Sequence, residues 1–137
     1  MPTQLSPYIS FRGQAREAMQ FYRDVFGGEL SMNTFAEFGQ ADAPFADQIM
    51  HAMLVTTGGL TLMGSDIPPG MAFSEGQRVT LAISGEDEAE LRGYWNGLID
   101  GGTVMTPLDV QIWGDLYGQC TDRFGVVWLV NISATGD

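Results

Sequence analysis

Residues 15–28 read AREAMQFYRDVFGG, and residues 89–102, 74 positions later, read AELRGYWNGLIDGG. In the first stretch apolar side chains recur with a period near 3.6, which predicts an amphipathic helix that ends at the glycine pair. Laid on each other, the two stretches match at four points: Ala15 with Ala89, Phe21 with Trp95, Val25 with Ile99, and Gly27-Gly28 with Gly101-Gly102. These matches indicate a duplicated chain.

Strand patterns surround each predicted helix in the same order, one strand before it and three after it. The first half is expected to have strands at residues 7–12, 29–38, 48–57 and 60–65 around a helix at 14–26. The second half is expected to have strands at residues 77–84, 103–107, 110–121 and 126–132 around a helix at 86–99. We therefore predict an α+β fold of two tandem βαβββ modules.

The modules extend over about residues 7–65 and about residues 77–132, and a turn-rich linker at 66–76 joins them. Four strands are too few to close a barrel, so each module should form a curved mixed sheet with its helix on the outer face. The concave faces are expected to line a small-molecule pocket. The length fits one domain, residues 1–137.

The charge balance argues against several classes of partner. With 17 acidic and 6 basic residues the formal net charge is −11, which repels phosphate backbones and anionic lipid. We expect neither nucleic acid nor a membrane as a partner, and we interpret the acid excess mainly as a soluble surface. No apolar run could cross a bilayer, and MPTQLSPYIS at the N-terminus does not read as a secretory signal. A cytoplasmic location is expected.

Three stretches together carry a family resemblance: PYISFRGQAREAMQFYRDVFGGEL from residue 7, IMHAMLVTTGGLTLMGSD from residue 49, and WGDLYGQCTDRFGVVWLVN from residue 113. They resemble the PhnB-like branch of the glyoxalase, bleomycin-resistance and dioxygenase group, known as the vicinal oxygen chelate superfamily. The resemblance implies a paired βαβββ fold and commonly a homodimer that packs sheet to sheet. The enzymes of this superfamily depend on a divalent metal, so the resemblance also implies a metal site formed by His, Gln or Glu side chains, one from each of four strands.

The four ligand positions that this resemblance implies fall at about Pro7, at Leu62 or Met63, at Arg78 or Val79, and at about Leu129. None of these side chains offers the carboxylate oxygen or imidazole nitrogen that Mg²⁺, Ni²⁺, Zn²⁺ or Fe²⁺ prefers. We therefore expect no metal and no other cofactor at the usual positions. Some relatives are labelled as ubiquinone-type methyltransferases, but no glycine-rich loop follows the first strand to hold S-adenosylmethionine.

The candidate ligand-binding residues are His51, Met53, Trp113, Tyr117 and Cys120. His51 is the single histidine, and a hydrogen-bonded structural role competes with a role as pocket acid, base or donor. Strand alternation would place it on one face with Ile49, Met53 and Val55. Both faces of this strand are apolar, so periodicity does not show which one lines the pocket.

The other candidates have structural alternatives as well. Trp113 and Tyr117 could stack on a ligand, whereas Trp113 and Trp128 could equally anchor the core or a dimer interface. Cys120 as a nucleophile would need a nearby base, and His51 is the single imidazole available. Asp122, in the segment TDRFG, is interpreted as a structural turn residue.

Three functions remain open. The leading one is a metal-independent small-molecule-binding protein of the PhnB-like group, with an unknown ligand that is apolar or aromatic. The second is a metal-dependent lyase, isomerase or dioxygenase-like enzyme that uses His51 together with Glu37, Asp66 or Asp115. The third is an antibiotic-sequestering resistance protein, because bleomycin-resistance relatives bind a cationic antibiotic in an acidic groove.

Overall fold

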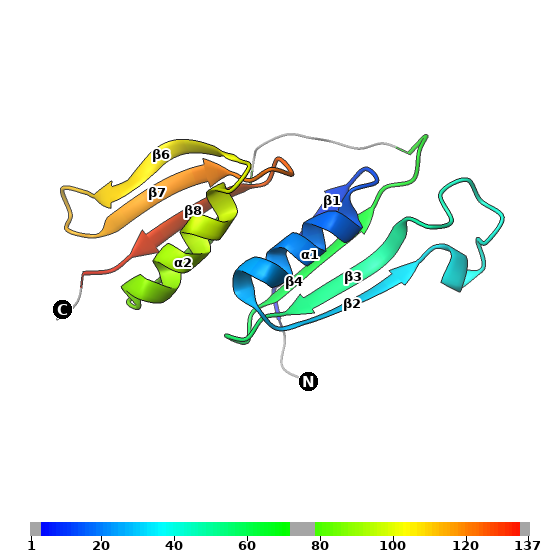
Figure 1. Ribbon diagram of the computed structural model, residues 1–137, viewed down its shortest axis with the longest axis horizontal. Coiled ribbons are helices and arrows are strands. Elements are labelled where there is room, and N and C mark those ends of the chain that lie inside the picture. Colours follow the sequence, from blue (N-terminus) through cyan, green and yellow to red (C-terminus); the bar gives the residue numbers. More distant parts are fainter. Residues whose placement is uncertain (1–3, 72–78, 135–137) are drawn as a thin grey trace. The chain divides into compact units, whose positions relative to one another are not determined.

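The computed structural model describes residues 4–71 and 79–134 (Figure 1). Its contacts divide the chain into two compact units, residues 1–75 and 76–137. The boundary falls within the predicted linker. Among the described residues, no helix is long and apolar enough to cross a membrane.

The described part of unit 1 contains one α-helix, a short 3₁₀ helix and one four-stranded sheet. Its elements are β1 (Tyr8–Phe11), α1 (Ala15–Phe26), β2 (Glu29–Thr34), a short 3₁₀ helix η1 (Ala36–Phe38), β3 (Ile49–Val55) and β4 (Thr61–Asp66). The strand order is β1-β4-β3-β2, in which β1 is parallel to β4 and the other pairs are antiparallel. Helix α1 lies across one face of this sheet (Figure 1).

Unit 2 repeats this arrangement. Its elements are β5 (Leu81–Gly85), α2 (Glu88–Ile99), β6 (Thr103–Val110), β7 (Leu116–Thr121) and β8 (Val127–Ile132). The strand order β5-β8-β7-β6 has the same pattern of one parallel and two antiparallel pairs. The prediction of an α+β fold with two tandem βαβββ modules is therefore confirmed.

The core of unit 1 lies between α1 and the covered face of the sheet. Met19 and Tyr22 of α1 are fully buried, and so are Ala52 and Leu54 of β3. A buried carboxylate connects these elements, because Asp66 accepts hydrogen bonds from the backbone N–H groups of Ala15 and Ile49, each at 2.9 Å. The start of α1 and the start of β3 are thereby fixed to the end of β4.

The duplicated glycine pairs have the same structural role in both units. A Cβ atom added at Gly28 would lie 2.0 Å from the carbonyl oxygen of Val55, and one added at Gly102 would lie 2.3 Å from that of Thr121. Val55 ends β3 and Thr121 ends β7. The second glycine of each pair therefore lets the chain leave its helix directly against the end of the third strand.

Several predicted strands have bounds that differ from those in the structure. The strand expected at residues 29–38 ends at Thr34 and is followed by η1. The cause is the Glu37 carboxylate, which accepts hydrogen bonds from the backbone N–H and the hydroxyl of Thr34 at 3.0 and 3.2 Å. These bonds fold the chain back, although the apolar pattern continues to Phe38.

The strand expected at residues 110–121 is in fact two strands joined by a turn. β6 continues through Pro107 to Val110, and β7 begins at Leu116. Gln111 and Asp115 close the turn by a backbone hydrogen bond of 2.9 Å. β6 tolerates Pro107 because it is an edge strand whose pairing shifts register nearby.

The strand expected at 77–84 begins at Leu81, while residues 77 and 78 lie outside the described ranges.

Candidate functional site

One face of the first sheet is free of α1, and we call it the open face of unit 1. Burial along β3 assigns the side chains to faces, because Ala52 and Leu54 are fully buried whereas Met53 and Val55 are 36% and 42% exposed. His51 therefore lies on the open face with Met53 and Val55. Ile49 departs from the expected alternation and is fully buried, because the pairing with β2 shifts register at this point.

Cross-strand pairing defines the remaining members of the open face. Met63 stands beside Tyr8 on one side and Met53 on the other, and Met53 stands beside Ser31. Asn33 stands beside His51. Residues paired in this way point to the same side of a sheet. The open face thus carries an apolar row, Tyr8-Met63-Met53, next to the polar pair of His51 and Asn33.

Tyr8 and His51 are joined on this face although 43 positions separate them in the chain. The Tyr8 hydroxyl lies 3.3 Å from Nδ1 of His51, and the two rings are tilted by 36° with their centroids 5.9 Å apart. Tyr8 is half exposed. The sequence analysis identified His51 but missed Tyr8. The signal that could have found Tyr8 is strand alternation, which places it on the opposite face from Phe11, a buried residue three positions later in β1.

Next to this pair, Glu37 has a structural role. The Thr34 backbone N–H, the Thr34 hydroxyl and the Asn33 side chain all donate hydrogen bonds to its carboxylate, and together they lower the pKa of Glu37. The carboxylate is therefore engaged in the turn that ends β2.

The structure buries Cys120 on the covered face of the second sheet. Its side chain is fully buried, and desolvation, assisted by the charge of Asp122, raises the pKa of the thiol to about 11. A neutral, inaccessible thiol is a weak nucleophile. Cys120 is thus placed apart from the ligand-accessible surface that the sequence reasoning expected it to share.

Trp113 and Tyr117 contact each other in unit 2. Their ring centroids lie 6.2 Å apart in an edge-on arrangement, and Trp113 is 59% exposed. The Tyr117 hydroxyl donates to the side-chain oxygen of Gln119 at 3.4 Å. Trp128 differs from Trp113, because it is buried and its indole N–H donates to Asp122 at 2.9 Å. Trp128 is thus a core anchor, and Trp113 is available at the surface.

Tyr117 occupies the place in unit 2 that His51 has in unit 1. His51 lies four residues before Val55, the strand end that contacts Gly28. Tyr117 lies four residues before Thr121, the strand end that contacts Gly102. The duplication therefore presents a different hydrogen-bonding ring at the same position in each sheet.

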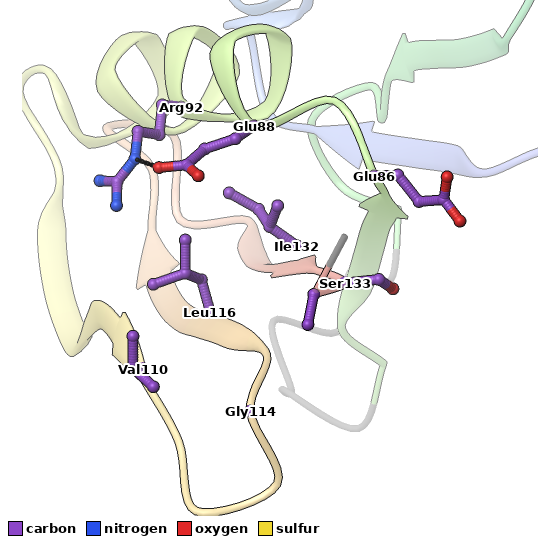
Figure 2. Close-up of a pocket in the computed structure, with 9 residues that line it drawn as sticks. Glu86, Glu88, Arg92, Val110, Gly114, Leu116, Ile132 and Ser133 are labelled. Carbon is purple, nitrogen blue, oxygen red and sulfur yellow. Dashed lines mark hydrogen bonds and ion pairs between the residues drawn. The ribbon is translucent and has the colours of Figure 1, made fainter. Parts of the chain in front are cut away.

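Unit 2 also contains a cavity of about 420 Å³ between the start of α2, the β6–β7 turn and the end of β8 (Figure 2). It is lined by Glu86, Glu88, Arg92, Val110, Gly114, Leu116, Ile132, Ser133 and Ala134. Arg92 donates to Glu88 at 2.7 Å, so these two charges neutralise each other on the helix side. None of the five sequence-predicted site residues lines this cavity.

The residues at the superfamily's metal positions do not fit a metal. Pro7 has no side-chain donor atom, Leu62 is buried, and the side chains of Met63, Val79 and Leu129 are not oxygen or nitrogen ligands. Arg78 lies outside the described residues. Within the described part of the chain, no group of three or more His, Cys, Asp and Glu side chains could hold a metal ion.

The carboxylates that were candidate metal ligands together with His51 each accept hydrogen bonds from other residues. Asp66 uses both carboxylate oxygens to accept backbone N–H groups, and Glu37 is bonded to Thr34. Asp115 belongs to unit 2, where its two oxygens accept from Asn131 and from the backbone of Ala134 at 3.1 and 3.0 Å. Each of these carboxylates is thus committed to a local hydrogen bond.

Two four-stranded mixed sheets, each with one α-helix, form a fold that is also found in solved structures described as glyoxalase, bleomycin-resistance and dioxygenase domains. A domain of that description from Frankia sp. EAN1pec has the same fold, with a TM-score of 0.68 and 16% identity over 98% of this chain and 99% of that chain. The chain belongs to the PhnB-like family whose model is described as 3-demethylubiquinone-9 3-methyltransferase and matches residues 3–131.

Two individual relatives are similar over nearly the whole chain. Protein PA1353 from Pseudomonas aeruginosa is 36% identical with a TM-score of 0.86, covering 96% of this chain and 98% of that chain. Protein YjdN from Escherichia coli is 29% identical over 93% of this chain and 94% of its own length. The turn between β1 and α1 does not have the glycine-rich loop that would hold the cofactor of a methyltransferase. It consists of Arg12, Gly13 and Gln14 and thus has one glycine.

Proposed function

We propose that this protein binds an apolar or aromatic small molecule without a metal ion, on the open face of unit 1. The observation that carries the proposal is the Tyr8–His51 pair, with its hydrogen-bonding distance of 3.3 Å, beside the partly exposed side chains of Met53 and Val55. Binding sites for small molecules typically combine an apolar lining with a few polar groups that fix orientation. Met side chains adapt their shape to such ligands and contact aromatic rings favourably.

Metal independence is supported by the chemistry of the chain's own residues. The superfamily's usual ligand positions carry Pro, Leu, Met, Val and Arg, and the carboxylates suggested as alternatives accept hydrogen bonds from their own units. In this proposal the hydrogen bonds of Tyr8 and His51 orient the ligand, which is the task that a metal performs elsewhere in the superfamily.

The functional form in this proposal is a homodimer. Support comes from apolar side chains exposed on β6 and its turn, among them Val110 and Ile112, at the edge of the second sheet. Exposed apolar groups of this kind often mark a protein interface. Light scattering at micromolar concentration should give twice the chain mass of 14.9 kDa. A mass of one chain under these conditions would contradict the dimer.

A thermal-shift screen with metal analysis tests the proposal. Protein purified without chelator is expected to contain less than stoichiometric divalent metal, and an aromatic hit should raise its Tm equally with and without EDTA. A ligand at about one hundred times its Kd stabilises the folded state by about 2.7 kcal/mol, enough to raise Tm by several degrees.

Substitutions then locate the binding. His51→Ala should abolish the shift, whereas Tyr94→Phe, an aromatic substitution on α2 of the other unit, should retain it. A stoichiometric divalent ion that is lost in His51→Ala would overturn the proposal in favour of a metal-dependent enzyme. Hits restricted to cationic glycopeptides at low salt would favour antibiotic sequestration.

A further inference from the structure

The hydrogen bond between Tyr8 and His51 determines what the pair can offer a ligand. A neutral imidazole has one donor and one acceptor nitrogen. If the Tyr8 hydroxyl donates to Nδ1, the Nε2–H of His51 remains as a donor. If Nδ1 carries the hydrogen and donates to the phenol oxygen, the Tyr8 O–H remains as a donor. In both arrangements at least one N–H or O–H group is left for a ligand, which must supply an acceptor.

Protonation of His51 increases this donor capacity. Both ring nitrogens of an imidazolium donate, so Nδ1–H is directed to the Tyr8 oxygen while Nε2–H and the Tyr8 O–H are left for a ligand. Hydrogen bonds between a charged donor and an anionic oxygen are about twice as strong as neutral ones. The protonated pair therefore favours a ligand that carries a negatively charged oxygen.

The residues next to His51 in the sheet are uncharged. Its partners in the sheet are the uncharged Asn33 on β2 and Met53 in its own strand, next to Met63 on β4. The nearby carboxylate of Glu37 is held by Thr34 and Asn33, and that of Asp66 by Ala15 and Ile49. Glu29, also on β2, pairs with Val55 at the far end of β3.

The apolar row specifies the remainder of the ligand. Tyr8, Met63 and Met53 stand side by side across three strands, and Tyr8 is half exposed. A row that combines an aromatic ring with thioether side chains can contact the face of a planar ring. We infer that the Tyr8–His51 pair binds the anionic oxygen of a planar aromatic ligand, a carboxylate or phenolate, whose ring lies along Met63 and Met53. This inference rests on the proposed function and names its ligand class.

Calorimetric titration with 2-naphthoate and its neutral analogue 2-naphthamide tests the inference. The naphthoate carboxylate is ionised at about pH 7, so the two compounds differ mainly in the charge of the group that would meet the pair. We expect naphthoate to bind about tenfold more tightly than naphthamide. Tyr8→Phe should weaken naphthoate about fivefold, because one donor is lost.

His51→Gln removes the imidazole and leaves the other charges of the chain unchanged. The variant should retain naphthamide binding but lose most of the preference for naphthoate, while Tyr94→Phe on α2 of the other unit should behave as the unaltered protein. An equal preference for naphthoate in His51→Gln would overturn the inference and leave the proposed function intact. Binding of neither compound, at millimolar concentration in folded protein, would count against both.

Discussion

Asp66 and Asp122 are both buried, and each carboxylate organises the backbone around it. Asp122 accepts hydrogen bonds from the backbone of Phe124 and Val126 at 2.8 and 3.1 Å and from the Trp128 indole. Its structural role was predictable from the turn sequence TDRFG. The role of Asp66 was not, because its partners Ala15 and Ile49 are distant in the chain and become neighbours only in the folded sheet.

For the site residues too, contacts between residues distant in the chain could not be predicted from the sequence. His51 could be identified as the single histidine, but its face could not, since both sides of its strand are apolar. Tyr8 reaches His51 because β1 and β3 flank β4, a pairing that periodicity does not reveal. Cys120 was a candidate pocket residue and is fully buried, because an alternating strand pattern does not show which face the helix covers.

The buried thiol of Cys120 gives a prediction at the residue scale. Its pKa is about 11 in the folded state against an ordinary value of 9.0, so folding favours the neutral form. The associated stability is complete below the ordinary value and is lost as the pH rises from about 9 toward about 11. Iodoacetamide at neutral pH should alkylate the native protein at least about a hundredfold more slowly than the urea-unfolded chain. Rapid stoichiometric alkylation of native protein would contradict the burial of this thiol.

Among the described secondary-structure elements, both α-helices and the succession of strands along the chain could be predicted from periodicity and glycine positions, whereas the order of strands within each sheet could not. The errors fall where a side chain or a turn interrupts an apolar pattern that continues. Glu37 ends β2, and the hydrogen bond between Gln111 and Asp115 separates β6 from β7. Local hydrogen bonds of this kind compete with strand propensity, and hydrophobic periodicity does not report them.

The glycine pair after α1 gives a prediction at the element scale. Gly28→Ala combines a positive φ of 107° with a Cβ atom that would overlap the Val55 carbonyl. We expect a loss of at least about 3 kcal/mol in the free energy of unfolding, measured by urea denaturation. Gly59→Ala is the matched control, since its φ is 88° but nothing lies within 4 Å, and it should lose about 1 kcal/mol. Equal losses in the two variants would show that the contact with Val55 contributes nothing.

For the whole molecule, the duplication explains how one sequence pattern yields two distinct surfaces. Both units use the same strand order and the same glycine contact, yet the equivalent ring positions carry His51 in unit 1 and Tyr117 in unit 2. The net charge of −11 opposes an anionic ligand at long range, but physiological salt screens that field over roughly 8 Å. Short-range hydrogen bonds from Tyr8 and His51 can therefore determine the ligand.

The most direct test of the central claim is a methyl NMR titration of chelator-treated protein, labelled at its methionine methyl groups, with 2-naphthamide. The account predicts saturable shifts of the Met53 and Met63 signals, because these side chains form the row beside His51, and no shift of Met19, which is fully buried under α1. Met→Leu variants assign the signals. Shifts confined to Met105 in unit 2, or a titration in which Met53 and Met63 do not move, would contradict ligand binding on the open face of unit 1.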